Sequence, residues 1–213
     1  MTRLVVATRN PGKVREIHEM LAALGGYEVV GLAGLAVPES PEEDAVEAFG
    51  TFEENALAKA RYFAEKTGLL ALADDSGICV DALGGAPGVR SRRFAAADEA
   101  RGERQDEANN RHLLGLLRDV PDALRTARYV CAAALAWPDG RELVRTGACE
   151  GVLLRAPRGS GGFGYDPIFY LEGEGMTFGE LPAERKNALS HRGRAVRAAV
   201  DALAGVDEKG TII

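Results

Sequence analysis

A run of four aliphatic residues near the N-terminus, LVVA at positions 4–7, most constrains the fold of this chain. A run without polar alternation is typical of a strand that is buried on both faces, as in sheets covered by helices on both sides. Asn10 and Pro11 follow closely and favour a helix start, because asparagine caps helices and proline suits the first helical turn. Apolar residues then recur at helical spacing over positions 14–24. The chain therefore begins with a predicted strand, loop and helix.

The remaining segments mix strand and helix patterns without strict alternation. The patterns predict strands at 27–32, 69–73 and 165–170 and helices at 51–66, 104–117 and 189–203. Thr51 and Glu54 have the spacing of a capping box, which marks a helix start. Two longer strand patterns, 126–137 and 142–154, flank a Pro-Asp-Gly turn and predict a hairpin. We therefore expect an α/β fold with a mixed sheet and flanking helices.

Composition excludes several classes of protein. The 213 residues are 46% hydrophobic and 27% charged, which suits one domain over 1–213 with a substantial core and excludes a disordered chain. The net charge of −6 argues against a protein that wraps a polyanion, so we expect no nucleic-acid partner. The three cysteines form no CxxC pair, and the longest apolar run, 130–137, is too short to span a bilayer. The N-terminal apolar run is too short for a signal peptide, so we expect a cytoplasmic protein without a membrane partner.

Two adjacent carboxylates, Asp74 and Asp75, follow the apolar strand predicted at 69–73. Like charges side by side repel unless a cation or hydrogen-bond donors compensate them, and ligands of α/β sheets bind where strands end. Carboxylate oxygens are ligands that Mg²⁺ prefers. We interpret the pair as a metal site, to which Glu47 in the acidic loop 38–50 could add a ligand. The alternative is a plain surface turn.

The loop between the first strand and its helix is a candidate phosphate site. Free backbone N–H groups and the positive end of the helix dipole attract anions. Lys13 in the first turn is unfavourable to that dipole, and a bound anion would account for its presence. A capped surface helix with a solvated lysine is the alternative. The loop is not a P-loop, because the GxxxxGK[ST] spacing is absent.

Two further stretches could hold a base. Residues 159–166 combine glycines, which allow close backbone approach, with aromatic rings that can stack on a base. A flexible hairpin tip with one core aromatic residue is the alternative. Lys186, His191 and Arg192 gather donors for a polar, anionic ligand, although His191 alone would be an ordinary surface histidine. Together the stretches indicate a nucleoside triphosphate hydrolase that lacks a P-loop.

Six strings, in order along nearly the whole chain, carry a resemblance to a known family. They are ATRNPGK at 7–13, TFEENALAKAR at 51–61, LADDSG at 72–77, LGGAPGVRSRRFA at 83–95, GSGGFGYDPIF at 159–169 and ERKNALSHRGRA at 184–195. The sequence resembles the non-canonical purine nucleoside triphosphate pyrophosphatases. The resemblance implies Mg²⁺-dependent hydrolysis of ITP, dITP and XTP to the monophosphate and pyrophosphate by a homodimer. It also implies a long mixed sheet with two lobes around an active-site cleft.

The resemblance also implies roles for individual residues. The family's phosphate-binding stretch falls on Thr8, Arg9, Asn10, Gly12 and Lys13. The proton acceptor and metal ligand falls on Asp75, the second metal carboxylate on Glu47, and Asp74 supports the metal site. Further substrate contacts fall on Lys59, Ser76, Phe163, Gly164, Tyr165, Asp166, Lys186, His191 and Arg192, of which all but the first two hold the base.

These roles predict a mechanism with Mg²⁺ held by Glu47 and Asp75. We expect Asp75 to accept a proton from the water that attacks the α-phosphorus. Arginine only donates hydrogen bonds, so Arg192 is expected to pair with the 6-keto group of hypoxanthine or xanthine and to reject adenine. Three alternatives stay open: a Maf-like pyrophosphatase with another base preference, a catalytically silent nucleotide-binding regulator, and a structural scaffold.

Overall fold

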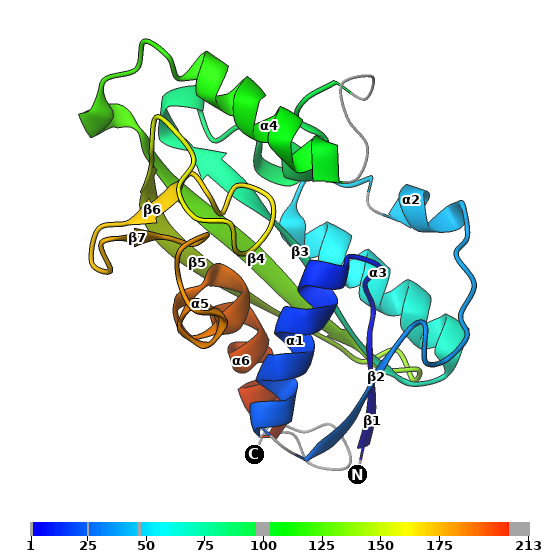
Figure 1. Cartoon of the computed structure of the whole chain (residues 1–213). Coiled ribbons are helices and arrows are strands. Elements are labelled where there is room, and N and C mark those ends of the chain that lie inside the picture. The colour runs from blue at the N-terminus through cyan, green and yellow to red at the C-terminus, as the bar shows by residue number, and fades with distance from the viewer. Residues whose placement is uncertain (1, 25, 47, 97–102, 205–213) are drawn as a thin grey trace. The chain divides into compact units, whose positions relative to one another are not determined.

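The computed structural model describes residues 2–24, 26–46, 48–96 and 103–204 (Figure 1). The described residues form a seven-stranded sheet with the strand order β2-β1-β3-β4-β5-β6-β7. Its strands are β1 (Thr2–Val6), β2 (Tyr27–Gly31), β3 (Leu70–Val80), β4 (Thr126–Ala136), β5 (Glu142–Leu153), β6 (Phe169–Leu171) and β7 (Met176–Thr177). The α-helices are α1 (Pro11–Leu24), α2 (Glu42–Val46), α3 (Phe52–Thr67), α4 (Glu103–Leu116), α5 (Ala183–Leu189) and α6 (His191–Ala204). Short 3₁₀ helices cover Asp81–Leu83, Gly88–Arg93 and Asp122–Leu124.

The predicted mixed sheet is confirmed by the strand pairing. β1 pairs in parallel with both β2 and β3, whereas β6 pairs antiparallel with β5 and β7. The chain divides into two compact units. The first comprises Met1–Asp75, Cys131–Gly147 and His191–Ile213, and the second comprises Ser76–Val130 and Ala148–Ser190.

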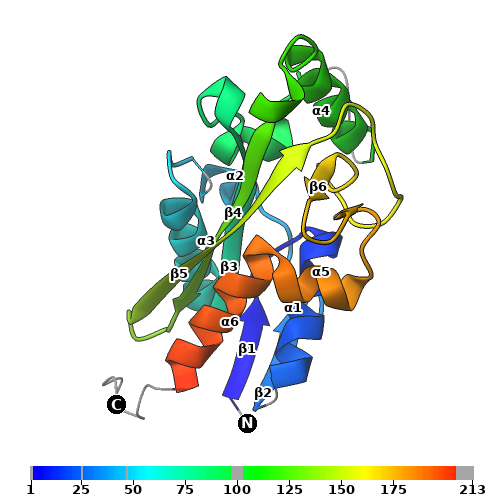
Figure 2. The same ribbon diagram turned by 90° about the vertical axis from the view of Figure 1, so that its left-hand side faces the viewer.

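In the first unit, β1 is buried on both faces, as its aliphatic run predicts. Leu4 and Val5 are fully buried. α1 and α6 lie on one face of β1 and α3 lies on the other (Figure 2). The apolar core includes Ile17 and Leu21 from α1 and Val196 from α6. Helices therefore exclude water from both sides of this part of the sheet.

Local sequence signals set the helix starts of the first unit. Asn10 caps α1, because its Oδ1 atom accepts hydrogen bonds from the N–H groups of Gly12 and Lys13 at 2.9 and 3.1 Å. The Thr51 hydroxyl accepts a hydrogen bond from the Glu54 N–H and caps α3. Both predicted caps are confirmed.

The predicted end of the third strand is wrong. β3 continues through Asp74 and Asp75 to Val80, and it is β1 that ends here, opposite Leu72. Gly77 lets the strand continue close to the neighbouring 3₁₀ helix, because a side chain there would collide with the main chain and with Ser91. The two carboxylates therefore lie inside β3, just beyond the end of its parallel neighbour.

Two further predicted elements differ from the structure. The strand predicted at 165–170 is reduced to β6, because the Tyr165 carbonyl accepts hydrogen bonds from the N–H groups of Ile168 and Phe169 and closes a turn. The single helix predicted at 189–203 is preceded by α5 and begins only at His191, after Ser190 in an extended conformation. The predicted hairpin is confirmed as β4 and β5.

A mainly aromatic and aliphatic core fills the second unit, with Ile78, Leu113, Phe169 and Phe178 fully buried. Among the helices that the structure describes, none combines the length and apolar composition needed to span a bilayer.

Candidate active site

The five residues predicted to bind phosphate lie in the first turn of α1 or just before it. The Thr8 hydroxyl accepts a hydrogen bond from the Asn10 N–H at 3.2 Å, which shapes the loop before the helix. The sequence suggested free N–H groups at this helix start. In the structure, however, the N–H groups of Gly12 and Lys13 donate to the Asn10 cap. An anion at this helix start would therefore depend on the Lys13 ammonium and the helix dipole.

Of these five residues, Arg9 has a side chain that is held by contacts with the acidic loop and the residue before it. Its guanidinium forms an ion pair with Glu43 at 2.7 Å and donates hydrogen bonds to the carbonyls of Val37 and Pro38. The Glu43 hydrogen bond raises the pKa of Arg9, and the same contact lowers the pKa of Glu43. Arg9 therefore ties the acidic loop to the start of α1.

Asp74 lies at the centre of a buried charge cluster, which we define as Lys13, Glu16, Asp74 and Arg192. Lys13 Nζ and Arg192 Nε lie 3.0 and 3.1 Å from the same oxygen, Asp74 Oδ2. Arg192 Nη1 also pairs with Glu16 of α1. The Asp74 and Arg192 side chains are almost completely buried. The cluster thus joins α1, β3 and α6.

The cluster determines the charge states of Asp74 and Arg192. Burial alone would raise the pKa of Asp74, but the charges of Lys13, Arg192 and Lys59 outweigh it and hold the pKa well below its usual range. Burial disfavours the charged form of Arg192, but the carboxylates of Asp74 and Glu16 raise its pKa. The negative charge of Asp74 and the positive charge of Arg192 therefore compensate each other.

Asp75, the next residue, makes a different contact. Its Oδ2 atom accepts a hydrogen bond from the Asn55 side chain of α3 at 3.0 Å. Successive side chains of a strand point to opposite faces, and α3 lies on the opposite face from α1 and α6 (Figure 2). The adjacent carboxylates of Asp74 and Asp75 therefore contact different helices.

Asn55 is a site residue that the sequence interpretation missed. It is almost completely buried. Its side chain also exchanges two hydrogen bonds with the main chain of Phe49, at 2.9 and 3.3 Å. Lys59, predicted to contact substrate, follows one turn later and is also buried. Asn55 is a polar residue on the apolar face of the amphipathic helix α3. This position was the signal in the sequence that could have identified it.

The oxygen atoms of Asp75 and the neighbouring Ser76 suit a hard cation such as Mg²⁺. Glu47, the predicted second metal ligand, lies outside the described residues. In the part of the chain that the structure describes, no three His, Cys, Asp or Glu side chains are grouped as a metal site. Asp75 is half-buried and oriented by an amide. It therefore fits the role of a metal ligand, which Glu47 would share.

In the second unit, the structure brings together Phe163, Asp166 and Lys186 of the predicted base-holding residues. Lys186 Nζ lies 2.6 Å from Asp166 Oδ2 and 4.8 Å from the centre of the Phe163 ring. Asp166 Oδ2 also accepts a hydrogen bond from the Phe163 N–H at 2.8 Å. Both charged side chains are buried. This pair fixes the backbone that carries the Phe163 ring.

His191 and Arg192 belong to the first unit, at the start of α6, and both are buried. The contacts of Arg192 are those of the charge cluster, with Asp74 and Glu16. Because these residues lie close to Lys186 in the sequence, we expected one common group of donors. The helix is interrupted at Ser190, however, and Lys186 pairs with Asp166 whereas Arg192 pairs with Asp74.

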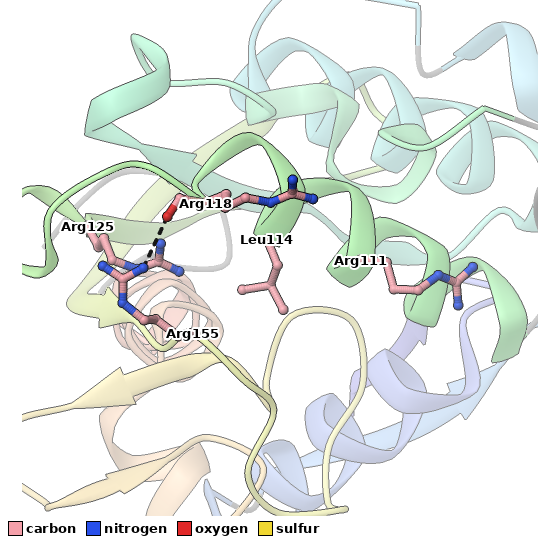
Figure 3. Close-up of a pocket in the computed structure, with 6 residues that line it drawn as sticks. Arg111, Leu114, Arg118, Arg125 and Arg155 are labelled. Atoms are coloured by element: carbon pink, nitrogen blue, oxygen red, sulfur yellow. Dashed lines mark hydrogen bonds between the residues drawn. The ribbon is translucent and has the colours of Figure 1, made fainter.

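A pocket of about 360 Å³ in the second unit contains none of the predicted site residues (Figure 3). It is lined by Arg111, Leu114, Gly115, Arg118, Arg125 and Arg155. Arg125 donates to the carbonyls of Leu117, Leu153 and Leu154. Arg155 donates to Asp122 and to the carbonyls of Arg118 and Val120. These two arginines stabilise the C-terminal end of α4, where the helix dipole disfavours a bound anion.

Comparison with known proteins gives consistent results. A family model described as the Ham1 family matches residues 4–202. A dITP/XTP pyrophosphatase of Streptomyces coelicolor is 52% identical over 201 residues, which cover 94% of this chain and 96% of that protein. One of Thermus thermophilus is 49% identical over 200 residues, covering 94% and 91%.

Solved structures are also similar. The structure of a Ham1 protein from Coxiella burnetii matches with a TM-score of 0.80 and 37% identity, covering 96% of this chain and 99% of that one. A nucleoside-triphosphatase / dITP/XTP pyrophosphatase from Mycobacterium abscessus matches with a TM-score of 0.70 and 45% identity, covering 92% and 98%.

Proposed function

The chain belongs to the Ham1 family, and on this basis we propose that it hydrolyses ITP, dITP and XTP to the monophosphate and pyrophosphate. The observation that carries the proposal is the position of Lys13. Its ammonium, at the start of α1, lies 3.0 Å from Asp74, the residue next to the candidate metal ligand Asp75. A phosphate-binding helix start and a metal-binding carboxylate are thus neighbours in one compact unit.

Each residue of the first unit has a defined part in the proposed reaction. Lys13 and the positive end of the α1 dipole stabilise negative charge on the triphosphate. Asp75 accepts a proton from the water that attacks the α-phosphorus, and Asn55 holds the Asp75 carboxylate in orientation. Asp74 holds the Lys13 ammonium in place. Asp75 and Glu47 would hold a Mg²⁺ ion, and such an ion would neutralise charge at the phosphates.

Base recognition is assigned to the predicted base-holding residues. The Phe163 ring offers a stacking face, and the Arg192 guanidinium and the Lys186 ammonium only donate hydrogen bonds. A donor suits the 6-keto group of hypoxanthine and xanthine, whereas the 6-amino group of adenine would be left facing another donor. His191 and Arg192 contribute further donors, and the carboxylate contacts of Arg192 hold its guanidinium in place.

Two experiments test the proposal. The first measures pyrophosphate release with Mg²⁺ from ITP, dITP, XTP, GTP, ATP and dTTP at equal concentration. Preference for ITP, dITP and XTP supports the proposal, preference for dTTP indicates a Maf-like specificity, and no release from any substrate indicates a silent binder. Separately from these two experiments, size measurement in solution tests the homodimer that the family resemblance implies, and fractionation of cells tests the expected cytoplasmic location.

The second experiment replaces Asp75 by Asn. The variant should lose nearly all turnover, because an amide cannot accept the proton, while its urea unfolding midpoint stays close to that of the wild type. Asp139→Asn is the matched control, because Asp139 is an exposed carboxylate at a hairpin turn and should keep full activity. Normal turnover by the Asp75→Asn variant would exclude the proposed mechanism.

A further inference from the structure

Two side chains of α4 hold the peptide groups on both sides of Gly164. The Gly164 N–H donates a hydrogen bond to Asp106 Oδ2, and the Gly164 carbonyl accepts one from Asn110 Nδ2, both at 2.8 Å. Asp106 and Asn110 lie one helical turn apart, so they face the same side of α4. Gly164 has a φ of +62°, in the left-handed region that favours glycine. The two contacts therefore hold a backbone turn that has few alternatives.

The residues on either side of Gly164 are also fixed. The Phe163 N–H donates to Asp166, and the Tyr165 hydroxyl donates to the Ser91 carbonyl at 2.8 Å. Burial, together with the charge of Asp106, raises the pKa of Tyr165, so its hydroxyl stays protonated and remains a donor. The segment 163–166 is thus held from several elements of the second unit.

The burial of Asn110 is unfavourable for stability taken by itself. The residue is 8% exposed. Its Oδ1 atom has no hydrogen-bond partner among the described residues, which is unfavourable for a buried acceptor. Its Nδ2 atom, however, donates to the carbonyls of both Gly164 and Asp106. An apolar residue at position 110 could not donate the hydrogen bond to the Gly164 carbonyl.

We propose that Asp106 and Asn110 are positioning residues for purine recognition, which hold Gly164 so that the adjacent Phe163 ring is presented to the base. The inference rests on the proposed function of the 163–166 segment. Neither α4 residue needs to touch the nucleotide. The expected signature is a loss of affinity for the base without a loss of affinity for the phosphates.

The test compares two ligands. The dissociation constant of IMP is measured by calorimetry without metal, and the inhibition constant of inorganic triphosphate is measured against ITP hydrolysis. Asp106→Ala should weaken IMP binding and raise the KM for ITP about tenfold, the usual effect of one strong hydrogen bond. The inhibition constant of inorganic triphosphate, measured with the Asp106→Ala variant, should stay within twofold of the wild-type value.

Matched variants separate positioning from general damage. Asp106→Asn should restore IMP affinity, because the amide oxygen can still accept the Gly164 N–H. Asn110→Asp keeps the side-chain shape but removes the donor, so it should weaken IMP binding like Asp106→Ala, and it decides the question if Asp106→Ala does not fold. Glu107→Ala, at an exposed position on the same helix, is the control and should bind IMP normally.

The possible outcomes are distinct. IMP binding within twofold of wild type in both Asp106→Ala and Asn110→Asp would overturn the inference, and so would an equal loss of IMP and triphosphate affinity. If the wild-type protein neither binds IMP nor hydrolyses ITP, the proposed function itself fails and the inference fails with it. Weakened IMP binding with unchanged triphosphate binding supports both.

Discussion

Replacing Asp74 by Asn tests whether the buried charge cluster stabilises the first unit. The change preserves the shape of the side chain but removes the negative charge shared by Lys13 and Arg192. Removing one partner of a buried ion pair costs roughly 3–5 kcal/mol, because it leaves an uncompensated charge. Arg192 keeps Glu16 as a partner, and the Lys13 side chain is 14% exposed and can be partly hydrated. We therefore expect the lower end, a loss of about 3 kcal/mol in the free energy of unfolding.

Urea unfolding followed by tryptophan fluorescence measures this loss. The single tryptophan, Trp137, packs against the core of the first unit and reports on the region that contains Asp74. For a chain of this length, each kcal/mol shifts the melting temperature by roughly 2–4 °C. The variant should therefore melt about 6–12 °C below the wild type. Asp139→Asn removes an exposed ion pair of the same unit and should leave the midpoint unchanged.

The pH dependence gives a second, independent readout. The folded-state pKa of Asp74 lies below its unfolded value of about 3.9. The stabilisation is therefore complete above about pH 5 and is lost as the pH falls toward the folded-state pKa. At pH 3 the stability difference between wild type and variant should be about 1 kcal/mol smaller than at pH 7. A loss below about 1 kcal/mol at pH 7, or a difference that does not change with pH, would refute the reasoning.

Two further predictions concern packing and reactivity. Gly77→Ala should lower the free energy of unfolding by roughly 1–3 kcal/mol, because the new methyl group would collide with the Gly88 carbonyl and the Ser91 hydroxyl. Circular dichroism during urea unfolding measures the loss, and Gly115→Ala, at a helical position with open space, should cause none. Burial raises the pKa of Cys131, so its thiol should resist iodoacetamide at pH 8 in the native protein and react in urea, as mass spectrometry can show.

Elements with strong local signals were predictable from the sequence. The Asn10 cap and the Thr51 capping box depend on residues within three positions of each other, so their hydrogen bonds are encoded locally. The continuation of β3 was not predictable, because Asp-Asp-Ser-Gly is typical of a turn. Its place in the strand depends on Gly77 passing close to a 3₁₀ helix more than ten residues away along the chain.

Site residues were predictable by type, but not by partner. Arg192 Nε reaches Asp74 across 118 positions of sequence, whereas its proximity to Lys186 in the sequence suggested a common role. Asn110 reaches the Gly164 carbonyl across 54 positions. Asparagines in helices form no pattern that identifies such a distant carbonyl. Pairing over such separations is decided by the packing of the elements that carry the residues.

The alternation of side chains along β3 explains how two adjacent carboxylates can have separate functions. Asp74 forms ion pairs with Lys13 of α1 and Arg192 of α6, and Asp75 is held by Asn55 of α3. It follows that the two isosteric Asn substitutions should differ in kind. At position 74 the substitution should reduce stability, and at position 75 it should remove turnover while stability is retained.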